Sequence, residues 1–104
     1  MPGKSGGKEG EIPLVRLPTM VFPVLKQNVV GRYLTINIEL HLSDMDARAR
    51  LAELQPKMVE TIFARLYGKV SDDTTEVDIQ KLVTAVSQTM IGDNKVASVS
   101  VELK

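Results

Sequence analysis

The clearest pattern in the chain is a run of alternating apolar and polar residues from Tyr33 to Leu42. Its apolar positions are Leu34, Ile36, Ile38, Leu40 and Leu42, and its polar positions are Thr35, Asn37, Glu39 and His41. A period of two residues, kept over this whole run, predicts a β-strand with one dry face and one wet face. The run is long enough to form the central strand of a small sheet.

A helical pattern follows this strand directly. Ser43 is a predicted N-cap, with Asp46 three residues later as in a capping box. Apolar residues then recur at spacings of three and four, at Ala47, Leu51, Leu54, Met58, Ile62 and Leu66. Because proline fits best at the first position of a helix, Pro56 predicts two helices, 44–54 and 56–67, with a bend between them. Gly68 predicts the end of the second helix.

Three further segments complete the predicted order. The segment 20–25 is expected to be a short edge strand, because Pro23 cannot donate to a ladder, and 27–31 is expected to connect it to the long strand. A third helix begins at Thr75, which forms a second capping pattern with Asp78, and its apolar stripe is Val77, Ile79, Leu82, Val83, Val86 and Met90. The last strand alternates Ala97, Val99, Val101 and Leu103 with Ser98, Ser100, Glu102 and Lys104.

The predicted fold is therefore α+β, in the order β-β-α-α-α-β, with a small antiparallel or mixed sheet and helices packed on one face. Residues 1–18 are expected to be a flexible linker and an extended lead-in, and residues 19–104 a single globular domain. The other face of the sheet should be solvated or used for contacts. Its polar residues are Thr35, Asn37, Glu39, His41, Ser98, Ser100 and Glu102.

Composition argues against several classes of function. The chain has 13 basic and 13 acidic residues without a basic stripe, which argues against a nucleic-acid partner. It has no cysteine, which excludes disulfides and thiolate metal sites. Its apolar runs are far shorter than the ~20 residues that span a bilayer, and no signal-peptide pattern follows Met1.

The single histidine, His41, is the first candidate for catalysis. Glu39 and Ser43 lie at same-face spacing on either side of it, so a His-Glu-Ser triad can be imagined. However, successive same-face residues of a strand stand about 7 Å apart and parallel, so they do not converge on one substrate atom. A surface histidine is the favoured interpretation.

Two other motifs suggest ligands only weakly. The acidic loop with Asp72, Asp73, Glu76 and Asp78 could bind a cation, but it lacks the oxygen spacing and the central glycine of a calcium hand, so helix capping is favoured. Gly3-Lys4-Ser5 is similar to the end of a phosphate-binding loop but lacks the upstream glycine. We therefore predict no enzyme, and no catalytic, cofactor-binding or metal site.

The run from Tyr33 to Leu40, then Ser43-Asp44, then a helix broken by Pro56, resembles the FliL family of flagellar basal-body proteins. Lys95-Val96 through Val101 fills the place of that family's final strand, so the resemblance covers about residues 19–104. It implies a non-enzymatic periplasmic domain at the inner membrane, similar in fold to stomatin-type (SPFH) domains. Such domains form homo-oligomeric rings and associate with the stator units of the flagellar motor.

The resemblance supplies no catalytic residues. It implies membrane attachment only through a helix that this chain does not contain, with the Gly-rich residues 1–11 as the flexible connection to it. Two alternatives remain open: a non-flagellar FliL/SPFH-like membrane-associated scaffold, or a soluble interaction domain that binds through its polar sheet face or its edge strand. A small hydrolase that uses His41 is the third hypothesis.

Overall fold

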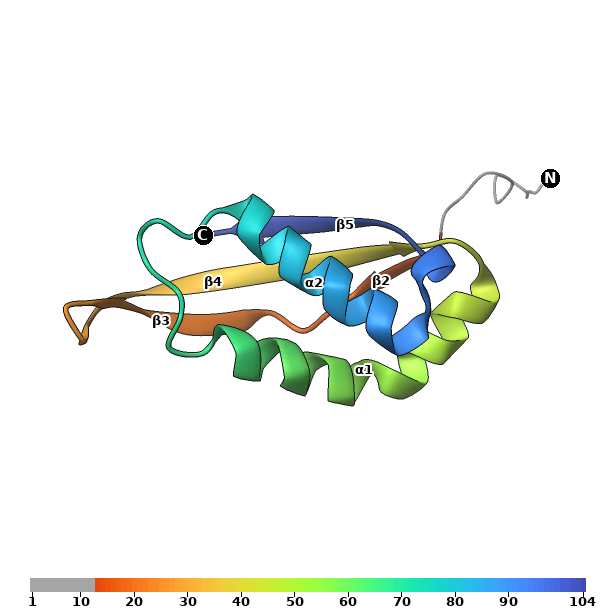
Figure 1. Ribbon diagram of the computed structural model, residues 1–104, viewed down its shortest axis with the longest axis horizontal. Coiled ribbons are helices and arrows are strands. Elements are labelled where there is room, and N and C mark those ends of the chain that lie inside the picture. Colours follow the sequence, from red (N-terminus) through yellow and green to blue (C-terminus); the bar gives the residue numbers. More distant parts are fainter. Residues whose placement is uncertain (1–12) are drawn as a thin grey trace.

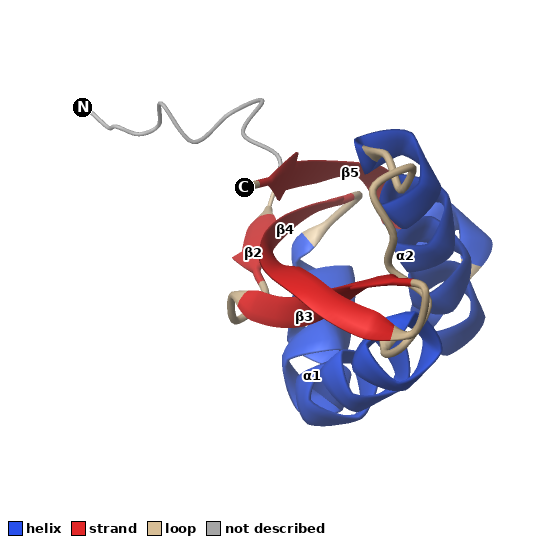
Figure 2. Ribbon diagram, turned by 90° about the vertical axis from the view of Figure 1, so that its left-hand side faces the viewer, coloured by secondary structure: helices blue, strands red, loops and turns tan. Residues whose placement is uncertain are grey.

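The computed structural model describes residues 13–104, so the expected linker over 1–11 lies outside the described residues. The elements are β2 (Leu14–Arg16), β3 (Met20–Lys26), β4 (Val29–Leu42), α1 (Met45–Leu66), α2 (Glu76–Ile91), the short 3-10 helix η1 (Asp93–Lys95) and β5 (Val96–Leu103) (Figure 1). The strands form one antiparallel sheet, and both helices pack on the same face of it (Figure 2). The predicted α+β class is confirmed.

Strand β4 is the centre of the sheet. Along one edge it pairs with β3 through its first part and with the short strand β2 near its end; along the other edge it pairs with β5 (Figure 1). The predicted edge position of β3 is correct, because β4 is its only strand neighbour among residues 13–104. Strand β2 was expected only as an extended lead-in, and its pairing with β4 depends on a partner that is distant in sequence.

The alternation along β4 is confirmed by burial. All five apolar positions from Leu34 to Leu42 are buried, and the polar residues between them are half-buried on the opposite face. The strand nevertheless begins at Val29, so the predicted connection 27–31 is too long. Gln27 and Asn28 alone make the turn, with φ of 54° and 66°, as a two-residue hairpin loop with positive φ at both positions requires.

Helix α1 is a single helix, so the prediction of two helices separated at Pro56 is wrong. The buried stripe runs past the proline, from Leu51 to Met58, and burial of these side chains against the sheet holds the helix together across the missing hydrogen bond. Pro56 itself lies on the exposed side, where water can bond the carbonyl that the proline leaves free. The observed order therefore has two α-helices instead of three.

The two helix starts differ in how well they were predicted. The capping box of Thr75 and Asp78 is present, with Thr75 N donating to Asp78 Oδ2 at 3.0 Å. At α1 the cap is Asp44 and not Ser43: the Asp44 carboxylate accepts from Ala47 N at 2.7 Å. Ser43 Oγ instead donates to the Asn94 carbonyl at 2.6 Å, which ties this corner to η1.

Two apolar positions that were predicted to be buried are exposed. The ladder pairs His41 with Ser98 but Leu42 with Val96, so Ala97 is an extra residue in a β-bulge and is exposed. Val96 takes the inward place instead. Val77, in the first turn of α2, is 53% exposed, whereas Ile79, Val83 and Val86 are buried as predicted.

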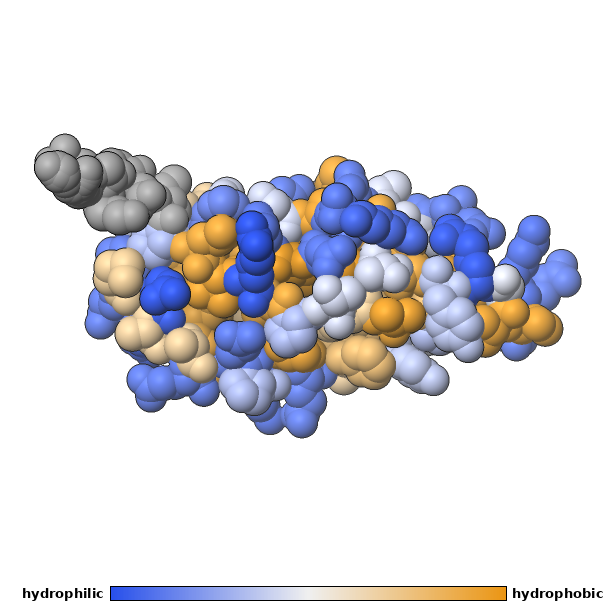
Figure 3. Space-filling model, turned by 180° about the vertical axis from the view of Figure 1, so that it is seen from behind, coloured by the Kyte–Doolittle hydropathy of each residue, from blue (hydrophilic) through white to orange (hydrophobic). Residues whose placement is uncertain are grey.

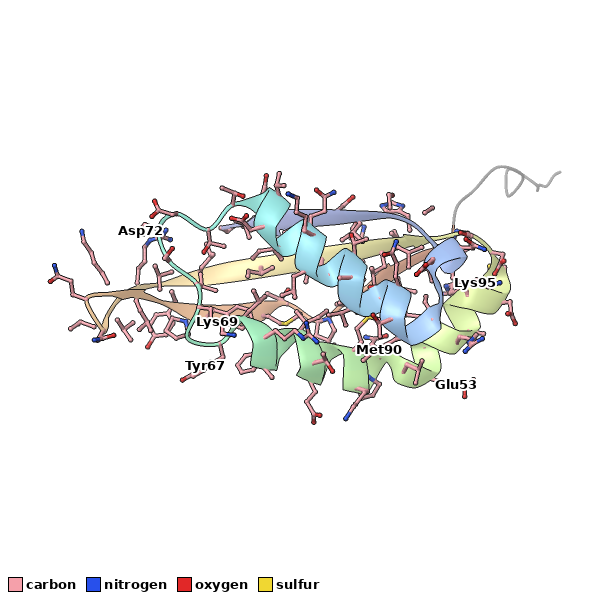
Figure 4. All side chains as sticks on the ribbon, in the orientation of Figure 1. Glu53, Tyr67, Lys69, Asp72, Met90 and Lys95 are labelled. Carbon is pink, nitrogen blue, oxygen red and sulfur yellow. The ribbon has the colours of Figure 1, made fainter. Side chains whose placement is uncertain are left out.

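Aromatic rings of β3 and α1 stack on one another near the β3–β4 hairpin. Phe22 on β3 stacks on Phe63 of α1 with ring centroids 4.9 Å apart, and Phe63 stacks on Tyr67 at 5.5 Å. The loop that follows α1 also contacts β3, because Leu25 N donates to the Val70 carbonyl. Figure 4 shows Tyr67 and Lys69 at this end of α1.

Replacing Pro56 with alanine should raise the free energy of unfolding by about 1–3 kcal/mol, because alanine restores a helix hydrogen bond and removes a steric clash. The measurement is urea denaturation followed by circular dichroism. As the matched control, A64P introduces a proline on the exposed side of the same helix and should cost about 3 kcal/mol. A loss of stability in P56A would contradict an uninterrupted α1.

Stability should also fall in acid because of the two helix caps. The hydrogen bond from the Ala47 backbone lowers the pKa of Asp44 below its ordinary 3.8, and the Thr75 backbone does the same for the pKa of Asp78. A pKa that is lower in the folded state stabilises the fold above pH 3.8, and this contribution is lost as the pH falls through the folded-state values. D44N and D78N should therefore flatten the dependence of the melting temperature on pH below about 4, whereas D73N, a change outside both helices, should flatten it less.

Candidate functional site

The polar face of the sheet is the surface that the sequence marks for contacts, and the structure assembles it from β4 and β5. The register sets His41 beside Ser98, Glu39 beside Ser100, and Asn37 beside Glu102. These are the predicted residues of the wet face, and the two strands bring them together opposite the helices. Figure 3 shows this face, on which polar side chains are interspersed with apolar patches.

Two residues of this face were missed by the sequence reasoning. Arg16 Nε donates to Glu39 Oε2 at 2.6 Å, and Thr19 Oγ1 donates to Asn37 Oδ1. Both come from the segment around β2, whose pairing with β4 the sequence did not reveal. The one available signal was the polar Arg16 between two apolar neighbours, which is typical of a half-buried strand.

Among residues 13–104, two open depressions hollow this face. One shallow depression is lined by Asn37, Glu39, Ser100, Val101 and Glu102, and a second adjoins it at Arg16, Leu17 and Thr19. Acceptors and donors of both charge signs line these depressions. Such a surface can hydrogen-bond a protein partner, but it does not enclose a small molecule as typical ligand pockets do.

The imagined His-Glu-Ser triad is not assembled. Glu39 is paired with Arg16, and Ser43 donates to the Asn94 carbonyl. The Ser100 hydroxyl lies 3.5 Å from His41 Nε2, which is longer than the 2.6–3.2 Å of an activated nucleophile. The geometry leaves His41 as a residue of the polar face.

The acidic loop is also divided among structural contacts. Asp72 pairs with Arg32 of β4 at 3.1 Å, and Figure 4 shows it in the loop beside the β3–β4 hairpin. Asp78 caps α2. Within residues 13–104, no three His, Asp or Glu side chains are grouped so that they could hold a metal ion. Gly3-Lys4-Ser5 lies outside the described residues.

Towards the hairpin the same face becomes apolar. Val21 and Thr35 pair across the strands, as do Pro23 and Tyr33, and Leu25 and Val30. Among these, Val21, Val30 and Tyr33 are 50%, 45% and 64% exposed. A polar area on the body of the sheet and an apolar area on its hairpin thus form one continuous surface.

No family model matches the chain, and no curated protein matches it either. Neither helix of the described part of the chain is long and apolar enough to cross a membrane.

A double-mutant cycle on Arg16 and Glu39 tests whether the polar face is held together by its own side chains. The coupling between R16A and E39A should be about 0.2–1 kcal/mol, as for other ion pairs near the surface, and should shrink in 1 M salt. Urea denaturation of the four proteins measures it. Strict additivity at low salt would show that this pair does not order the face.

Proposed function

We propose that this chain is a non-enzymatic protein-interaction domain. The observation that carries the proposal is the open face of the sheet, whose side chains bond to one another across strands instead of converging on one point. Arg16 with Glu39 and Thr19 with Asn37 are such pairs. They leave a broad, nearly flat surface with both charge signs, which favours contact with another protein over binding of a small substrate.

The specific role that we propose is FliL-like: a domain on the periplasmic side of the inner membrane that oligomerises, associates with flagellar stator units and supports motility. The support is the resemblance over residues 19–104, which rests on the strand 33–42 leading directly into a capped helix. The fold keeps that order, although its helix continues through Pro56.

The first described residue, Pro13, lies at the end of the domain opposite the hairpin, which suits a domain held by an N-terminal tether. Leu42 N donates to the Pro13 carbonyl at 2.8 Å, so the described chain enters beside the last residue of β4. The hairpin at the other end of this 14-residue strand lies roughly 45 Å away, at about 3.3 Å per residue. A tether before Pro13 would leave the exposed Val30 and Tyr33 at the far end, where a partner can reach them.

If the proposal is right, the host is flagellated, and deleting the gene should reduce its swimming in soft agar, which the wild-type gene should restore. A V30E/Y33E variant should fail to restore swimming, because two carboxylates on the apolar area oppose docking there. T89E, a change at an exposed position on α2, is the control and should restore it. Circular dichroism of the purified variants verifies that each is folded.

Normal swimming of the deletion strain would overturn the flagellar role. The remaining alternatives would then be a non-flagellar scaffold and a soluble interaction domain. Either would use the same surface. A reporter enzyme that is active only in the periplasm, fused to the gene product, tests the proposed location independently.

A further inference from the structure

Strand β5 forms an open edge of the sheet. Lys104 N donates to the Thr35 carbonyl, so the alternate residues Ser98, Ser100 and Glu102 direct their backbone groups toward β4. Val99, Val101 and Leu103 direct theirs outward. Within residues 13–104 no strand pairs with this edge, and the edge has neither a proline nor a bulge between Val99 and Leu103.

The surface of α2 beside this edge is almost free of charge. A groove between them is lined by Val77, Gln80, Lys81, Thr84, Ala85 and Gln88 of α2, together with Ala97, Ser98 and Val99 of β5. From Lys81 to the end of α2 there is no further charged residue, whereas α1 carries charges along its exposed side to its last turn. A weakly charged helix face next to an open strand edge is typical of a surface that another chain covers.

The sequence of β5 is complementary to itself when two copies run antiparallel. In the register centred on Ser100, Val99 faces Val101 of the second copy, Ala97 faces Leu103, and Ser98 faces Glu102. Apolar residues then meet apolar residues on the helix side, hydroxyls meet a hydroxyl or a carboxylate on the open side, and no like charges are opposed. Moving the register so that Glu102 lies on the axis would oppose two carboxylates.

We propose that two copies of this chain associate through their β5 edges about a two-fold axis at Ser100, which joins the two sheets into one. The outward backbone groups of Val99 and Val101 then bond to the second copy, and the two α2 faces flank the seam. The inference rests on the proposed function in that it names one surface by which copies of the domain pair. Because a two-fold contact closes at two copies, a ring would need a further interface.

One hydrogen bond of the single chain has to open for this pairing. Gln80 Nε2 donates to the Val99 carbonyl at 2.6 Å, from the side where the second copy would bind. The Val101 backbone N–H of the second copy would replace it. Gln80 thus covers the edge in the monomer and competes with association.

Cysteine cross-linking tests the axis directly, because the chain has no cysteine of its own. In S100C the two thiols would lie on facing residues about 4.5 Å apart at Cα, within the range of a disulfide. Mild oxidation of the purified protein should give mostly covalent dimer on a non-reducing gel. S98C, on the same face and strand, is the control: its two thiols would lie roughly 13 Å apart, and the dimer band should be at least tenfold weaker.

A variant pair tests the same surface without cross-linking. S98K would face Glu102 of the second copy with the opposite charge, and S98E with the same charge, so S98K should dimerise at least fivefold more tightly in sedimentation equilibrium. Q80A should also tighten the dimer. Equal cross-linking of S100C and S98C, or no difference between S98K and S98E, would overturn the proposal. Motility assays test the flagellar role separately. If S100C forms the dimer but deleting the gene leaves swimming normal, only the flagellar role is overturned. If deletion impairs swimming but S100C forms no dimer, only this interface is overturned.

Discussion

Strand β4 buries five inward side chains between Leu34 and Leu42, and the other elements are arranged to pair with it or to cover it. Its backbone needs hydrogen-bond partners along both edges, which β2, β3 and β5 supply. Its apolar face needs a cover, which α1 and α2 supply from the same side. Once that face is covered, the other face is exposed by necessity, and the residues available for contacts are fixed by the same alternation.

The features that could be predicted are those encoded by neighbouring residues. The alternation of β4, the Thr75–Asp78 capping box and the glycine after α1 each depend on a few adjacent positions, and each was read correctly. Pro56 was misread, because its local preference for a helix start is weaker than the continuous burial of Leu51 and Met58. Such tertiary effects act against propensity and leave no local signal.

The residues of the candidate site also fall into those that local sequence predicts and those that it does not. The residues of the polar face on β4 and β5 followed from periodicity alone, whereas Arg16 and Thr19 join it through pairings with distant residues. The bulge that exposes Ala97 was equally hidden, since two strand partners are needed to define it. Surface residues that follow from the alternation along one strand could therefore be predicted from the sequence. Surface residues that depend on how distant strands pair could not.

The pairing of β4 with β5 joins residues that are 54 to 67 positions apart along the chain, from Leu42 with Val96 to Ile36 with Leu103. The β3–β4 hairpin and both helices can form from contacts that are near in sequence, but β5 can dock only after this long loop has closed. Folding of the domain should thus be limited by the arrival of β5. Until then the edge of the central strand from Ile36 to Leu42 stays open, and an unfolded or newly made chain is at its most vulnerable to mispairing with its neighbours.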